Sequence, residues 1–446
     1  MSGEALLGLF LTAALGGLSL WLQRRASRAR HESWTRAARE CELVPVHGGM
    51  YTTGPSHPQP DLRVQLSVWS DGENTIGTIF VVEAIDRGIV TVTLRPETTA
   101  TARAKRRGAR EIETGDEAFD AAFYVTGPST PVRAVLDDET RGLLASLRTE
   151  AGLEVVDGEL RGRVRDRSDP SLPSTLPIAL AAAHRLRRPP DVPAALARNA
   201  RSDPQPRVRL ENLLALVREY PESEVTKAAM RAACDDANDE VRVRAATALG
   251  QEGRPTLLEI AKMEYAEDLP AARAIAALGD HLSSEDMRTI LARALRTRRL
   301  QTARACMDGL VRWAQGEAIP VIARVLALEK GELAVAAARA LAETGLADAE
   351  AQLLAALAHD LAELRVAAAT GLGRVGSAAA VLPLKEIETR YRDDATQRAA
   401  RQAVAAIQSR LPGASPGQLS LADAEAGALS LTEDETGRLS LEDGKK

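Results

Sequence analysis

The feature that most constrains this chain is a motif that occurs seven times between residues 208 and 404, at intervals of about 31 residues. The plainest copy is Asp-Glu-Val-Arg-Val-Arg-Ala-Ala-Thr-Ala-Leu-Gly, residues 239–250. The first position of the pattern, which we call the anchor, is occupied by Val208, Val241, Pro270, Thr302, Leu333, Leu364 and Thr396. Residues four and seven positions after each anchor are small or medium-sized, and the eighth is aliphatic. These positions share one face of a helix, so the pattern predicts a helix that a neighbour can approach closely.

Self-similarity at this period is typical of a solenoid of stacked helix pairs. Each copy of the motif predicts the second helix of a pair, and the stretch before it predicts the first. Hydrophobic residues make up 45% of the chain and aromatic residues only 3%, which fits a core packed by Ala, Leu and Val. We therefore predict an all-α solenoid over 178–411, in which the helix over 178–188 is an unpaired cap.

Turn residues support this division into helices. Acidic residues in the turns are placed to cap the second helices, and a glycine after some of them suits a left-handed C-cap. The acids are Asp203, Asp239, Asp268 and Asp394, and the glycines are Gly250, Gly279 and Gly373.

The pattern Asp-x-Val-Arg-x-x-Ala-x-x-Ala-Leu-Gly, matched by 239–250 and less completely by 362–373, resembles HEAT repeats, in particular the short bacterial variety related to phycocyanobilin lyases. The resemblance covers about half the chain and implies a curved platform for protein partners. The class includes bilin lyases and a DNA glycosylase family. Trp313 is the only Trp of the solenoid, so it offers little to stack a pigment or a base, and we predict no enzymatic activity and no cofactor.

The N-terminal segment predicts a membrane anchor. Residues 5–22 carry no charge, Trp21 suits a membrane interface, and arginines begin at Arg24. Because no Lys or Arg precedes the apolar run, the positive-inside rule predicts a single-pass protein of the bacterial inner membrane with its N-terminus outside. Residues 1–31 would be the anchor with its basic flank, and the bulk of the chain would be cytoplasmic. The alternative is a buried or lipid-surface helix.

Residues 61–164 predict a small α+β domain. It follows a juxtamembrane helix and linker over 32–60 and precedes a Pro-rich linker over 165–177. Alternation and turn residues predict strands over 63–69, 76–83, 89–94 and 119–125, a helix over 137–148 and a hairpin over 155–164.

Two stretches of this domain, 113–127 and 135–144, resemble a bacterial domain family of unknown function, through a Thr-Gly-Asp…Phe-Asp…Phe pattern before a helix. The resemblance implies no activity. Asp116 and Asp120 could form an acidic pair for catalysis, but no His, Lys or metal-ligand pattern accompanies them. The three cysteines are far apart, so neither a metal site nor a disulfide framework is predicted.

Arginines on the outward positions of the second helices form the candidate partner site. They are Arg244, Arg273, Arg304, Arg339 and Arg398. If second helices line the concave side, these side chains form a basic ladder suited to an acidic peptide. The alternative is a set of ordinary solvated arginines, some paired with nearby acids. The net charge of −5 argues against general nucleic-acid binding.

The C-terminal residues 412–446 predict a disordered acidic tail with three copies of Gly-x-Leu-Ser-Leu-x-acid. The leucines of these motifs are Leu419, Leu421, Leu429, Leu431, Leu439 and Leu441. The motifs could add as strands to a partner's sheet, occupy this protein's own groove, or only keep the chain soluble.

Together these features predict a multidomain, membrane-anchored and non-catalytic scaffold that binds protein partners through its solenoid. Two alternatives stay open. One is an enzymatic or ligand-binding α+β domain with the solenoid as an accessory. The other is a binder of lipid or nucleic acid through basic clusters such as 103–107 and 184–188.

Overall fold

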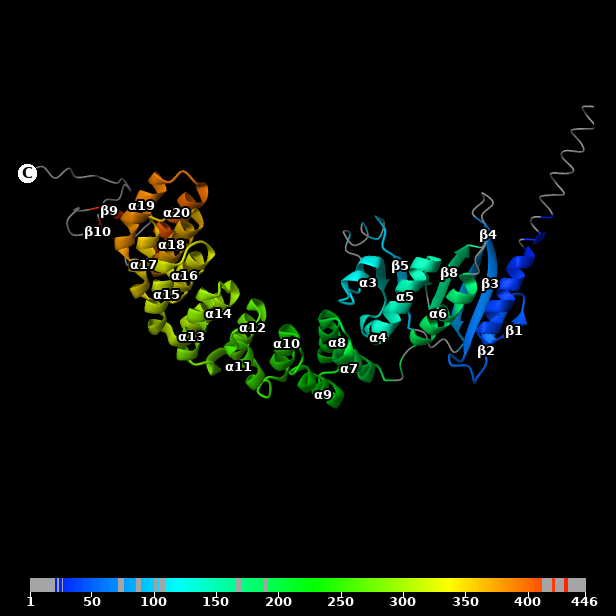
Figure 1. Ribbon diagram of the computed structural model, residues 1–446. Helices are drawn as coiled ribbons and strands as arrows, with labels where there is room; N and C mark the ends of the chain where they lie inside the picture. Colours follow the sequence, from blue (N-terminus) through cyan, green and yellow to red (C-terminus); the bar gives the residue numbers. More distant parts are fainter. Residues whose placement is uncertain are drawn as a thin grey trace, which may run out of the picture. The chain divides into compact units, whose positions relative to one another are not determined.

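The computed structural model (Figure 1) describes residues 21–410 with short gaps, together with 419–421 and 429–431. The gaps are 22–23, 26, 71–75, 86–89, 100, 102, 104–106, 108–109, 157, 166–170, 188 and 190. The chain divides into two compact units, Met1–Val241 and Arg242–Lys446, and each is described by itself.

An eight-stranded antiparallel sheet forms the core of the first unit, in the order β1-β2-β3-β4-β8-β7-β5-β6. The strands are β1 Leu43–His47, β2 Met50–Thr53, β3 Leu62–Ser70, β4 Ile76–Ala84, β5 Thr93–Pro96, β6 Phe123–Thr126, β7 Glu154–Val156 and β8 Glu159–Arg165. The period-two pattern of β3 has the predicted effect, because Leu62, Val64 and Leu66 are buried and the residues between them are not. The predicted hairpin over 155–164 is confirmed by the β7–β8 pairing.

Helices cover the face of the sheet to which these buried residues point. They are a helix that ends at residue 40, α5 (Asp138–Ala151) and α6 (Ser171–Arg185). Trp34 donates a hydrogen bond from its indole nitrogen to Thr78 Oγ1 of β4, at 2.9 Å. The core therefore lies between one layer of helices and one face of the sheet.

Four predicted segments of this unit differ in the structure. The stretch predicted as a helix and linker over 32–60 also contains β1 and β2, which belong to the sheet. The linker predicted over 165–177 contains the start of α6, where Leu172 and Leu176 are buried, and the helix predicted as a solenoid cap is the rest of α6 in the sheet core. The strand predicted over 119–125 begins as helix α3 (Glu117–Ala122), because the Asp116 carboxylate caps its first turn.

Helix pairs follow the sheet, and every predicted second helix is present. The first helices are α7 Val192–Ser202, α9 Glu224–Ala233, α11 Arg254–Lys262, α13 Ser284–Arg296, α15 Ala318–Leu328, α17 Glu350–Ala356 and α19 Val381–Arg390. The second helices are α8 Pro206–Glu219, α10 Asp239–Leu249, α12 Asp268–Leu278, α14 Leu300–Ala314, α16 Glu332–Glu343, α18 Ala362–Val375 and α20 Asp394–Arg410. A short helix α4 (Ser129–Val135) precedes α5.

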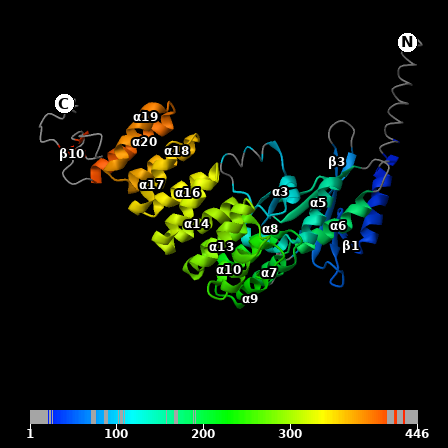
Figure 2. The same ribbon diagram turned by 60° about the vertical axis from the view of Figure 1, so that its left-hand side comes forward.

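The second helices of the second unit pack against one another in chain order. Contacts join α12 to α14, α14 to α16, α16 to α18 and α18 to α20, and these helices lie side by side (Figure 1, Figure 2). Small residues permit this close approach: a Cβ on Gly371 of α18 would lie 2.8 Å from the Cβ of Ala342. A small sheet domain followed by a helical-repeat region is thus the architecture of the chain.

The capping residues differ in detail from the prediction. The α10 turn is capped by Asn238, whose side-chain oxygen accepts from the N–H groups of Glu240 and Val241, so Asp239 is not the cap. Asp268 accepts from the N–H of Thr302 in the next second helix. Gly250 and Gly279 have the predicted positive φ, but Gly373 lies inside α18, where a Cβ would lie 3.1 Å from Ala403 Cα.

The predicted inner-membrane localisation is contradicted. In the part of the chain that the structure describes, no helix combines the length and apolar character needed to cross a membrane. The predicted span over 5–22 lies, apart from Trp21, outside the described residues.

Candidate functional site

A buried arginine joins the sheet domain to the first helix pair. Arg141 of α5 donates from Nε to Asp116 at 2.9 Å, and from its two terminal nitrogens to the two carboxylate oxygens of Asp203 at 2.9 and 3.1 Å. The Arg141 and Asp203 side chains are 2% and 0% exposed. Burial disfavours the charged guanidinium, but the hydrogen bonds to Asp203 and Asp116 outweigh this and raise the pKa of Arg141.

The same contact recurs between consecutive helix pairs. Arg209 of α8 donates to both carboxylate oxygens of Asp236 at 2.7 Å, and Arg365 of α18 donates to Asp393 at 2.8 Å. Each arginine also donates to backbone carbonyls just before its own helix, as Arg141 does to Leu136. Three arginine–aspartate links of one design therefore hold successive helical layers, and the first link begins in the sheet domain.

The Asp393 carboxylate predicts an acid-sensitive step. Hydrogen bonding from Thr396, together with Arg365, lowers the pKa of Asp393 from 3.8 to about 2. The carboxylate therefore stabilises the second unit above pH ~4, and this contribution is lost as the pH falls towards 2. We expect Asp393→Asn to remove that pH dependence from unfolding curves between pH 4 and 2. An unchanged slope in this window would contradict the assignment.

The acidic pair considered for catalysis has a structural role. The Asp116 carboxylate caps α3 and pairs with Arg141. The Asp120 carboxylate accepts from the Thr114 N–H and hydroxyl at 2.9 and 2.7 Å and from the Gly115 N–H at 3.0 Å. These contacts account for the Thr-Gly-Asp motif as a tight turn before a helix.

Groups that often carry chemistry are buried or dispersed in the described ranges. No cluster of His, Cys, Asp or Glu there could hold a metal ion. The three cysteines are buried, and none of them forms a disulfide with a described residue. Burial raises the pKa of Cys41 to about 11 and that of Cys306 to about 12, so neither thiol ionises near neutral pH.

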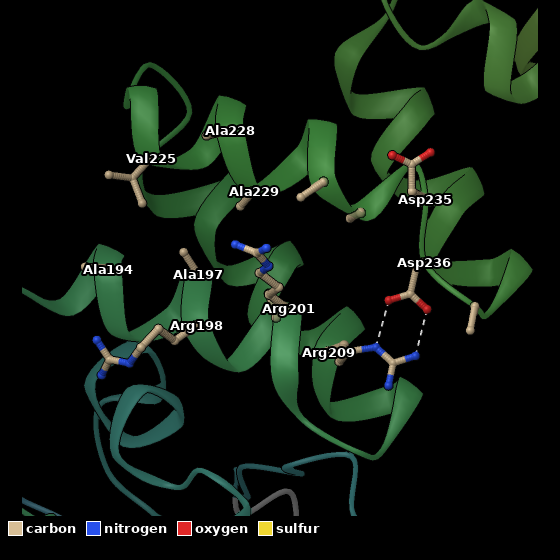
Figure 3. Close-up of a pocket in the computed structure, with 14 residues that line it drawn as sticks. Ala194, Ala197, Arg198, Arg201, Arg209, Val225, Ala228, Ala229, Asp235 and Asp236 are labelled. Atoms are coloured by element: carbon tan, nitrogen blue, oxygen red, sulfur yellow. Dashed lines mark hydrogen bonds and ion pairs between the residues drawn. The ribbon is translucent and has the colours of Figure 1, made fainter.

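A solvent-open groove lies between the first helices α7 and α9 (Figure 3), with a volume of about 660 Å³. We call it the α7/α9 groove. Small side chains line most of it: Ala194, Ala197, Ala200, Val225, Ala228, Ala229, Ala232, Ala233 and Ala237. The Arg209–Asp236 ion pair forms one end (Figure 3). Because alanines fill so little space between the helices, the groove stays open to an apolar side chain.

Two exposed arginines of α7 border the α7/α9 groove. Arg198 and Arg201 are three residues apart, and their guanidinium groups form no hydrogen bond or ion pair with any residue that the structure describes. The guanidinium of Arg201 extends between the two helices, and that of Arg198 lies at the rim (Figure 3). An apolar floor beside unpaired guanidinium groups suits the apolar face of a helix that also carries carboxylates. The predicted partner site lies on the second helices, whereas this groove lies between two first helices, so the repeat pattern did not predict it.

The structure brings together only two of the five predicted partner-binding arginines. Arg304 of α14 and Arg339 of α16 are exposed and line one groove of about 510 Å³ that also touches α18; we call it the second-helix groove. Arg398 of α20 is exposed but does not line it. Arg244 and half-buried Arg273 already interact with other groups. Of the five arginines, Arg304 and Arg339 line this groove together, and the longer five-arginine ladder stays a prediction.

The tail motifs differ from one another in what the structure describes. Leu419–Leu421 and Leu429–Leu431 form strands β9 and β10, which pair antiparallel with Ser420 opposite Ser430. The third motif, with Leu439 and Leu441, lies outside the described residues. The two described motifs thus pair with each other.

Comparison with known proteins gives no family. No family model and no curated protein matches the sequence. A solved structure of human deoxyhypusine hydroxylase in complex with glycerol is similar at 17% identity, over 49% of this chain and 96% of that chain, with a TM-score of 0.21. No conclusion about this chain rests on a likeness of that size.

Proposed function

We propose that this protein is a non-catalytic scaffold that binds a protein partner through HEAT-like repeats. The seven motif copies and the stacked helix pairs support the repeat assignment. The observation that carries the function is the α7/α9 groove, where an alanine-lined floor adjoins two unpaired arginines. Unpaired guanidinium groups beside an open apolar surface favour an interface over a purely structural role.

The partner that fits this groove is an amphipathic helix. Its small apolar residues would pack on the alanines of α7 and α9. Its carboxylates would meet Arg198 and Arg201, which lie on one side of α7 because residues three apart are neighbours on a helix. A bidentate carboxylate contact to Arg201 would set the orientation of the bound helix.

A photo-crosslinker in the groove tests this function. Ala228 is exposed and lines the groove, so p-benzoylphenylalanine at 228 in the full-length protein should give a discrete protein adduct in the source cells. Arg198→Glu with Arg201→Glu should lower its yield at least tenfold, because both charges then repel the partner's acids (about 1.4 kcal/mol or more).

The matched control reverses two exposed arginines on α8 that do not line the groove, Arg207 and Arg218. Both take part in exposed ion pairs, so their loss costs little stability. The control should keep the adduct. Failure to form any adduct at 228, or equal yield from the two double variants, would reject the groove as the binding surface.

A further inference from the structure

The second-helix groove changes charge along its length. The acidic residues lie at helix starts: Glu332 is the first residue of α16, and Glu363 lies in the first turn of α18. The basic residues lie further along their helices: Arg339 is two turns along α16, and Arg304 is in the second turn of α14. None of these four side chains forms an ion pair with another described residue. The apolar lining of the groove comes from half-buried Leu300 and Leu361 and from buried Val335. A ligand for this groove needs a cation, an apolar centre and an anion in that order.

We propose that this groove binds the third Leu-Ser-Leu motif of the same chain, residues 437–443. Its sequence is Gly-Arg-Leu-Ser-Leu-Glu-Asp, so Arg438 precedes the leucines and Glu442 and Asp443 follow them. The other two motifs have Gln418 and Ala428 where the third has Arg438. Charge complementarity therefore selects the third copy over the first two.

The lengths of motif and groove agree. From Glu332 to Arg339 the α16 backbone rises roughly 10 Å, at ~1.5 Å per residue. From Arg438 to Glu442 an extended chain covers about 13 Å, at ~3.3 Å per residue. The long side chains at both ends of the motif and of the groove can accommodate the difference between these two lengths. In an extended segment Leu439 and Leu441 would point to the same side, towards Leu300 and Leu361 of the groove lining, and Ser440 would point away from it.

The chain can also reach the groove. Helix α20 ends at Arg410 and packs against α18, which packs against α16. The 27 residues from 410 to 437 extend up to about 90 Å, and two helix–helix spacings need only ~20 Å. The first two motifs pair with each other in β9 and β10, which leaves the third for the groove. A partner that binds in the second-helix groove must therefore displace the third motif.

A labelled tail peptide tests the inference. The probe is a fluorescein-labelled peptide of residues 434–446, and the acceptor is the full chain with Arg438→Gln, Glu442→Gln and Asp443→Asn, the neutral-tail chain. Anisotropy should show at least tenfold tighter binding to the neutral-tail chain than to the wild-type chain, whose own motif fills the groove. Arg304→Glu with Arg339→Glu in the neutral-tail chain should weaken binding at least tenfold.

Two further variants show whether charge order matters. Arg324→Glu, an exposed arginine of α15 that does not line the groove, should leave binding unchanged. A probe with Glu442→Arg should recover affinity for the neutral-tail chain that carries Arg339→Glu alone, a rescue that misfolding cannot produce. Equal binding with and without the arginine reversals would overturn the site, as would a probe that does not bind.

Equal binding to the wild-type and neutral-tail chains would overturn occupancy of a chain's own groove. Sedimentation that shows a dimer only with the native tail would instead assign the motif to the groove of a second copy, which also contradicts the proposal. Neither readout depends on the α7/α9 groove, so failure here and failure of the proposed function are distinguishable.

Discussion

Arg141→Met is expected to lower the stability of the first unit by about 3–5 kcal/mol. The substitution leaves Asp203, which is 0% exposed, without the guanidinium that pairs with both of its oxygens. It also removes a donor to Asp116 and one to the Leu136 carbonyl. Leaving a buried carboxylate without a partner costs more free energy than the ion pair itself contributes. The loss of stability therefore comes mainly from the unpaired Asp203 carboxylate.

Hydrogen exchange of amides in α5 and α7 under native conditions measures this loss locally, which suits a chain of more than one unit. Adding Asp203→Asn to Arg141→Met should recover part of the protection, because the buried charge is then gone. Arg63→Met is the control: the side chains of the Arg63–Glu83 pair are 42% and 34% exposed, so water can replace the lost partner and the cost should stay below about 1 kcal/mol. A small effect at Arg141 would mean that Asp203 is hydrated or neutral.

The repeat was predictable because its information is local. Positions 0, 4, 7 and 8 report one helix face at each anchor, and all seven predicted second helices are present. The helix predicted over 137–148 is also present as α5, and the Asp137 carboxylate before it accepts from the Thr140 N–H at 3.0 Å. These signals lie within one turn or one helix, so no knowledge of the remaining chain is needed.

The domain boundaries and the candidate sites depend on distant residues. Because of Pro173 and Pro177, a linker was predicted where α6 begins, although Leu172 and Leu176 are buried in the core of the sheet domain. Arg141 and Asp203 are 62 residues apart, and nothing in the sequence pairs them. The same limit applies to the predicted arginine ladder. The outward positions of the second helices show which arginines face away from the core, but not which of them line the same groove.

Gly253→Ala is expected to destabilise the second unit by about 3 kcal/mol, at the upper end of the cost of overpacking. A Cβ at Gly253 would lie 2.0 Å from the carbonyl oxygen of Ala246 and 2.6 Å from its carbonyl carbon and Cα. All three atoms are backbone, so no side-chain rotamer relieves the contact and the α10–α11 turn must open. Urea unfolding monitored by hydrogen exchange in α10 and α11 measures the effect.

A substitution at Gly250, three residues earlier in the same turn, distinguishes the cost of steric crowding from the cost of an unfavourable backbone conformation. Its φ is +60° and no atom lies within 4 Å of a Cβ placed there, so Gly250→Ala should cost only the left-handed strain of about 1–2 kcal/mol. Because the atoms that meet a Cβ at 253 belong to the backbone, Ala246→Gly should not rescue Gly253→Ala. Equal losses of stability for the two glycine substitutions, or a rescue by Ala246→Gly, would contradict this. Either result would show that the turn relaxes and that the contact between Gly253 and the Ala246 backbone does not fix the α10–α11 geometry.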